Sequence, residues 1–131
     1  MRKSVIDSES PPYSAGAWAV GWVIFLGSGF AASVLLSNAW HDCDIGINAS
    51  ANLGALVLAS TSMAAASTLL WGLMRKVTGR RRLLPPLLMT VAAAAPLLWP
   101  LMAFWHAPDG YPVSFCAPDN VPPWWPGWLP V

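Results

Sequence analysis

The stretch AGAWAVGWVIFLGSGFAASVLL, residues 15–36, decides the fold, because it is long and apolar and carries no ionisable side chain. A helix needs roughly 20 apolar residues to cross the hydrocarbon core of a bilayer, which is about 30 Å thick. Residues 49–73 and 83–105 meet the same criterion, and none of the three stretches contains Asp, Glu, Lys, Arg or His. They predict an all-α integral membrane protein with three transmembrane helices.

The composition of the whole chain agrees with this prediction. Of its 131 residues 56% are hydrophobic and only 10% are charged, whereas about a quarter of the residues of a soluble domain are charged. Such hydrophobicity excludes a mainly disordered chain. The segments outside the three stretches are too short to form a second domain with its own core.

The basic residues predict how the chain is oriented. All seven lie before the first stretch or between the second and the third, on the side expected to face the cytoplasm. Residues 1–14 are therefore expected to be a cytoplasmic tail, 37–48 an outer loop, 74–82 a basic cytoplasmic loop and 106–131 an outer tail. The basic residues are Arg2, Lys3, Arg75, Lys76, Arg80, Arg81 and Arg82.

A cleaved signal peptide is the alternative to the first transmembrane helix, since Ser37-Asn38-Ala39 has the small residues of a cleavage site. Two features speak against it. The apolar stretch is longer than the 7–15 residues usual in a signal peptide, and Pro11-Pro12 interrupts the segment before it.

Small side chains recur along one face of each of the first two predicted helices. Such faces let helix backbones approach closely in a membrane, and hydroxyl groups can bond across the contact. This face can pack the two helices within one chain or join copies of the chain. The helix-packing residues predicted in this way are Gly21, Ser28, Ala32, Gly54, Thr61, Ala65, Thr68 and Gly72.

The third predicted helix carries two prolines in its second half. Pro96 and Pro100 each remove a backbone hydrogen bond, so a kink or local unwinding is expected near residues 92–100.

Aromatic and basic residues lie close to the predicted membrane boundaries. Indole rings favour the headgroup region, and basic side chains favour anionic lipid on the cytoplasmic side. The predicted interface anchors are Trp40, Trp105, Trp124, Trp125 and Trp128 on the outer side and Arg80, Arg81 and Arg82 on the inner side.

Both cysteines and both histidines fall on the predicted outer side. Cys43 and Cys116 are an even pair in an oxidising compartment, which favours a disulfide. The alternative is a Zn or Cu site formed by His41, Cys43, His106 and Cys116, whose ligand types suit these metals but whose spacing matches no compact metal motif.

The last residues, 118–131, contain five prolines and three tryptophans. Proline excludes a regular helix here and favours extended backbone. An irregular Pro/Trp-rich tail is expected, either lying along the outer membrane surface or docking on a neighbouring protein.

The sequence carries no motif that predicts catalysis, since it lacks C-x-x-C, a P-loop, G-x-G-x-x-G and H-E-x-x-H. We therefore expect a small multi-pass protein of a cell membrane that serves as a non-enzymatic accessory or scaffold subunit. Its expected partners are the lipid bilayer and either another membrane protein or a second copy, with no cofactor and no nucleic acid. An oligomeric, holin-like pore and an outer-face metal or redox protein are the alternatives. Many Ala, Gly and Pro residues, with Arg preferred over Lys, are typical of a GC-rich bacterial genome, so the bacterial cytoplasmic membrane is the expected location.

Overall fold

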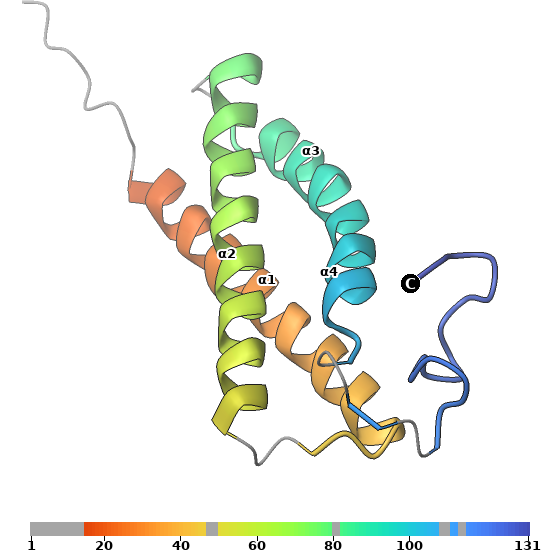
Figure 1. Cartoon of the computed structure of the whole chain (residues 1–131). Coiled ribbons are helices and arrows are strands. Elements are labelled where there is room, and N and C mark those ends of the chain that lie inside the picture. Colours follow the sequence, from red (N-terminus) through yellow and green to blue (C-terminus); the bar gives the residue numbers. More distant parts are fainter. Residues whose placement is uncertain (1–14, 47–49, 80–81, 108–110, 113–114) are drawn as a thin grey trace, which may run out of the picture.

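The computed structural model describes residues 15–46, 50–79, 82–107, 111–112 and 115–131. Three long helical segments make up the fold, and these residues contain no strand (Figure 1). They are α1 (Ala15–Asp42), α2 (Ser50–Thr78) and a third segment formed by α3 (Leu84–Ala94), a 3-10 turn (Ala95–Leu97) and α4 (Leu98–Trp105). All three segments are long and apolar enough to cross a membrane, which confirms the predicted fold class at this level.

The helix α1 ends six residues later than the predicted membrane segment 15–36, so much of the expected outer loop is helical. Its end is closed by a Schellman motif. The N–H of Ile45 donates to the carbonyl of Trp40 at 2.7 Å, and the N–H of Asp44 donates to that of His41 at 3.2 Å. Asp44 takes the left-handed conformation, φ 55°, that glycine usually supplies at this position.

The helix α2 also extends past its predicted end at residue 73, to Thr78. Gly79 follows with φ 85°, the conformation that ends helices and that side chains disfavour. The next helix begins with two prolines in its first turn, where their missing N–H groups cost no hydrogen bond.

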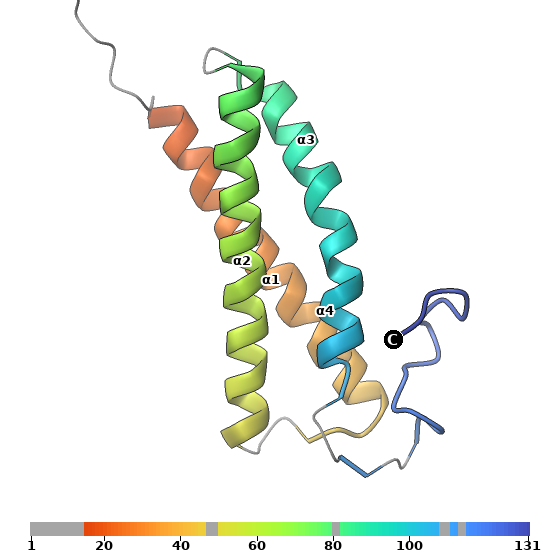
Figure 2. The same cartoon turned by 45° about the horizontal axis from the view of Figure 1, so that its top comes forward.

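The third segment is irregular where its prolines predict an irregularity. The 3-10 turn at Ala95–Leu97 contains Pro96 and lies inside the expected window 92–100. Figure 2 shows that α3 and α4 together form one bent rod beside α2.

The contacts between helices are unequal along the bundle. α1 packs against α2, α3 packs against α2, and α4 reaches both α1 and α2. The main buried cluster lies toward the end where α1 finishes and α4 stops (Figure 1). It contains Ala32, Leu36, Ala39, Trp40, Cys43, Ile45, Ala59, Met63, Leu101, Met102 and Cys116.

Candidate functional site: a disulfide-fastened cap

A disulfide fastens the C-terminal tail to the end of α1. Cys43 and Cys116 are joined with Cα atoms 5.2 Å apart, and both are buried. The structure thus pairs the two cysteines that the sequence places on one side. We call the described parts of residues 43–46 and 111–131 the disulfide cap.

Side-chain hydrogen bonds hold the disulfide cap on the helices. The indole N–H of Trp99, on α4, donates to the carbonyl of Pro130 at 2.7 Å. The hydroxyl of Tyr111 accepts a hydrogen bond from the N–H of Gly46 at 2.9 Å. The Nε2 atom of His106 lies 3.1 Å from the carbonyl oxygen of Asp119. The tail is therefore tied to both the loop after α1 and the end of α4.

Short turns fold the tail on itself despite its prolines. Asn120 donates its N–H to the carbonyl of Cys116 at 2.7 Å, and Trp125 donates its N–H to that of Pro122 at 2.9 Å. Each turn closes over three or four residues without a helix. The predicted irregular tail is thus an ordered series of turns rather than an extended strand.

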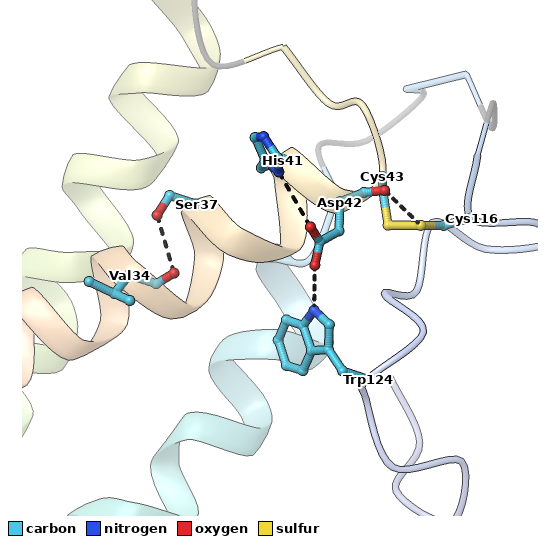
Figure 3. Close-up of polar contacts among 7 residues, drawn as sticks. All are labelled: Val34, Ser37, His41, Asp42, Cys43, Cys116 and Trp124. Carbon is cyan, nitrogen blue, oxygen red and sulfur yellow. Dashed lines mark hydrogen bonds and ion pairs between the residues drawn. A yellow bond between two sulfur atoms is a disulfide. The ribbon is translucent and has the colours of Figure 1, made fainter.

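Asp42 connects α1 to the tail through its carboxylate (Figure 3). Trp124 donates its indole N–H to Asp42 Oδ2 at 2.7 Å, and His41 Nδ1 lies 3.3 Å from Asp42 Oδ1. Asp42 is exposed and lies beyond the predicted membrane segment 15–36. Two hydrogen bonds hold the pKa of Asp42 below its ordinary value of 3.8. The one from Trp124 has the larger effect, and the one from His41 has the smaller.

This lowered pKa predicts how acid acts on the contact. A group whose pKa is lowered by folding stabilises the folded state while it is ionised, and this contribution is lost as the pH falls from 3.8 through the lowered pKa. We expect Trp124→Phe to raise the pKa of Asp42 toward 3.8, because the principal donor is gone. A carboxyl-carbon NMR titration of aspartate-labelled protein in micelles measures this change. Trp128→Phe is the matched control, and an equal shift in both variants would contradict the assignment.

The four residues of the alternative metal site do not form one in the oxidised chain. Cys43 and Cys116 are bonded to each other, so neither sulfur is a thiolate ligand. The ring nitrogens of His106 face the carbonyl oxygens of Met102 and Asp119, at 2.9 and 3.1 Å. Within the described ranges, no three His, Cys, Asp or Glu residues come together as metal ligands would.

A glycine outside the predicted packing set, Gly29, lies in the contact between α1 and α2. A Cβ atom on Gly29 would lie 3.4 Å from both the Cβ atom of Ala64 and the carbonyl oxygen of Ser60. One turn along, the hydroxyls of Ser33 and Ser60 form a hydrogen bond of 2.7 Å. Serine recurs in both helices, so the sequence alone gives no signal that singles out this pair.

The predicted packing residues occupy several different positions. Gly21 and Ala32 face inward: a Cβ on Gly21 would lie 3.5 Å from Trp71 Nε1, and Ala32 is buried. The hydroxyls of Ser28 and Thr68 bond to carbonyls of their own helices. The other four lie open: Gly54, Thr61 and Ala65 are exposed, and a Cβ on Gly72 would meet no atom within 4 Å.

The predicted interface residues also differ in their surroundings. Trp40 is 0% exposed and packs inside the protein, whereas Trp128 is 81% exposed. Trp105 and Trp125 are half-buried, and Trp124 is exposed. Arg82 is exposed at the start of the third segment, and Arg80 and Arg81 lie outside the described residues.

No protein-family model, curated protein or solved structure matches the chain.

Proposed function

We propose that the chain crosses the cytoplasmic membrane three times, with its N-terminus in the cytoplasm, and serves as a non-enzymatic accessory subunit of a membrane complex. Large apolar side chains such as Phe30, Leu69 and Phe104 point away from the bundle and are 72–79% exposed. Contiguous apolar surface of this kind suits hydrocarbon and is rare on soluble proteins.

The two ends of the bundle differ in a way that supports this orientation. Arg75, Lys76 and Arg82 lie where α2 gives way to α3, at one end, and the disulfide cap lies at the other (Figure 1). Basic residues are retained on the cytoplasmic side of membranes. Disulfides form and persist on the opposite, oxidising side.

The disulfide cap is the observation that carries the proposed subunit role. Phe115 is 75% exposed and directly precedes the disulfide residue Cys116, and Trp128 lies within the turn that the N–H of Leu129 closes on the carbonyl of Pro126. Their backbone is thus already ordered, so a partner that covers these rings loses little conformational entropy on binding. Exposed aromatic side chains on a rigid support are typical of interface hot spots.

The exposed face of α2 supports a second candidate, a pore formed by several copies. Gly54, Thr61 and Ala65 are exposed and lie along one face of α2. Small and hydroxyl side chains on a lipid-facing helix allow close packing with another copy.

Fusions to the two termini test the proposed orientation. We expect alkaline phosphatase to be active after residue 131 and a fluorescent protein to fold and fluoresce before residue 1. The opposite pattern, or recovery of the chain from the soluble fraction, would refute it.

Cross-linking in membranes distinguishes the two candidate functions. We expect the full chain to give a product with another membrane protein, and Phe115→Ala with Trp128→Ala to reduce it about tenfold or more, a loss typical of hot-spot residues. Phe30→Ala is the matched control, because Phe30 is equally exposed but lies in the middle of α1. Products that are only multiples of the chain's own mass, lost in Gly54→Leu, would favour the pore instead.

A further inference from the structure

A cavity of about 370 Å³ lies between α1, α2 and the third helical segment, near the middle of the bundle. Both α1 and α3 pack against α2, but they make almost no direct contact with each other. Figures 1 and 2 show the reason: α1 crosses α2 obliquely and meets the third segment only at α4, so its earlier turns diverge from α3. Small side chains line the space on both sides, Gly27 and Ala31 on α1 and Ala94 and Ala95 opposite. A Cβ atom on Gly27 would meet nothing within 4 Å.

Three hydroxyl groups interrupt the otherwise apolar walls, and they differ in their hydrogen bonds. Ser28 donates to the carbonyl of Ile24 at 2.7 Å, and Thr90 donates to that of Pro86 at 2.6 Å, so each is satisfied within its own helix. Ser67, on α2, is 1% exposed, and its hydroxyl has no hydrogen-bond partner among the described residues. A buried hydroxyl without a partner is unfavourable and rare in folded proteins. The cavity therefore holds a donor whose acceptor the described part of the chain does not supply.

The depth of Ser67 and the lining of the cavity restrict what can supply that acceptor. Ser67 precedes Arg75, the first charged residue after it on α2, by eight residues, or about 12 Å along the helix axis. The ester and phosphate oxygens of a phospholipid lie at the edge of the hydrocarbon core, which is about 30 Å thick, and so do not reach this depth. The residues that line the cavity include no ionisable side chain, so a charged ligand would have no counter-charge. A neutral molecule that is dissolved in the bilayer interior and carries an accepting oxygen meets both conditions.

We propose that this cavity binds a bilayer-dissolved quinone, with one ring carbonyl accepting a hydrogen bond from the hydroxyl of Ser67. The inference rests on the proposed insertion in a membrane, which surrounds the cavity with hydrocarbon. A quinone is neutral and compact, and it carries its carbonyl oxygens on an apolar body. Sites for small molecules have volumes of about 300–1,000 Å³ and apolar walls with a few fixed polar groups, as this cavity has. A helix of a second copy fits less well, because a helix is about 10 Å wide and the cavity closes where α4 reaches α1.

Equilibrium dialysis of the full chain in detergent micelles against empty micelles tests the proposal with two matched probes. Duroquinone and durene each have a six-membered ring with four methyl groups, and they differ in the two carbonyl oxygens of duroquinone. We expect the chain to bind about tenfold more duroquinone than durene in excess of the empty micelles, the effect of pairing one buried hydroxyl. Equal binding of the two probes would overturn the proposal, because the cavity would then accept any apolar molecule.

Two serine variants test the role of the free hydroxyl. Ser67→Ala is expected to reduce the binding of duroquinone about tenfold and to leave that of durene unchanged. Ser28→Ala is the matched control, because it removes a hydroxyl that lines the same cavity but already donates within its own helix. We expect it to bind duroquinone as the wild-type chain does. An equal loss in the two variants, or no loss in Ser67→Ala, would refute the proposal.

A pair of glycine variants locates the site in the cavity. Gly27→Leu puts a side chain into the open space and is expected to reduce the binding of duroquinone about tenfold. Gly54→Leu, also in open space but on α2 and away from this cavity, should leave it unchanged. Circular dichroism checks that both variants keep their helices. Unchanged binding in Gly27→Leu, or a dimer of the wild-type chain that this variant abolishes, would refute a quinone site, and the dimer would assign the cavity to a second copy.

The orientation fusions separate this inference from the proposed function. A chain that inserts with the expected topology but binds duroquinone no better than durene has no quinone site, and its membrane location stands. A chain with the reverse topology refutes the proposed orientation, whereas a cavity near the middle of the bundle keeps its preference for duroquinone. A chain recovered from the soluble fraction fails both.

Discussion

Replacing Cys43 with serine is expected to release the C-terminal tail from the helices. The disulfide closes a loop across 73 residues of sequence, for which the chain-entropy model gives about 4 kcal/mol. Helices already held in a bilayer are less free than an unfolded chain, so we expect a loss of about 2–4 kcal/mol in the docking of the tail. The remaining hydrogen bonds, such as those from Trp99 and Trp124, are then too few to keep the tail in place.

Chymotrypsin added from the outer side measures this release, since the tail is rich in aromatic residues. A loss of about 2 kcal/mol corresponds to cleavage about 30-fold faster, if cleavage follows the fraction of open tail. Cys43→Ser with Cys116→Ser should be no worse than either single variant, because one bond is lost in all three. Equal cleavage rates in the wild-type chain and the variants would show that the disulfide does not hold the tail.

The three long helices follow from the sequence because the thickness of a bilayer fixes a length that any spanning helix must satisfy. Residues 15–36, 50–73 and 84–105 each lie inside one of the observed helical segments; Leu83 just precedes the third, and Ala49 lies outside the described residues. Pro96 likewise predicts the 3-10 turn, since a missing N–H group acts within its own helix. Local and length-dependent constraints of this kind can be read from a single sequence.

Such constraints do not predict where α1 ends. Hydropathy marks where lipid should end, at about residue 36, and it says nothing of a helix that continues beyond the lipid. The stop is set by Asp44 in a left-handed conformation, a role for which glycine is the usual signal and aspartate a weak one.

The sequence predicts an irregular tail but not the way the tail folds, because the contacts of the tail join residues far apart in sequence. Asp42 and Trp124 are 82 positions apart, and Tyr111 and Gly46 are 65 apart. Only the cysteine pair gave a sequence signal for such a contact, since two lone cysteines on one side can be matched by counting. The serine pair across α1 and α2 gave none, because serine is common in both helices.

Trp40→Ala is expected to be the most destabilising single substitution in the chain. The side chain is the largest among those fully buried, and it belongs to the main buried cluster with Leu36 and Met102. Removing a buried tryptophan leaves a cavity and typically costs about 3–5 kcal/mol. Trp40 also donates its indole N–H to the carbonyl of Trp105 at 3.0 Å, which ties α1 to the end of α4.

Unfolding of the purified chain in detergent, monitored by circular dichroism, measures the loss of stability in Trp40→Ala. Two further variants separate the contribution of the buried ring from that of the hydrogen bond. Trp40→Phe keeps an aromatic ring but leaves the Trp105 carbonyl without its donor, so we expect a smaller loss, of about 1–3 kcal/mol. Trp128→Ala removes the same side chain from an 81% exposed position and should change stability by less than about 0.5 kcal/mol. If Trp40→Ala is as stable as Trp128→Ala, Trp40 faces lipid or detergent, as its place near a predicted membrane boundary suggests. The assignment of Trp40 to a buried cluster that holds α1, α4 and the disulfide cap together would then be wrong.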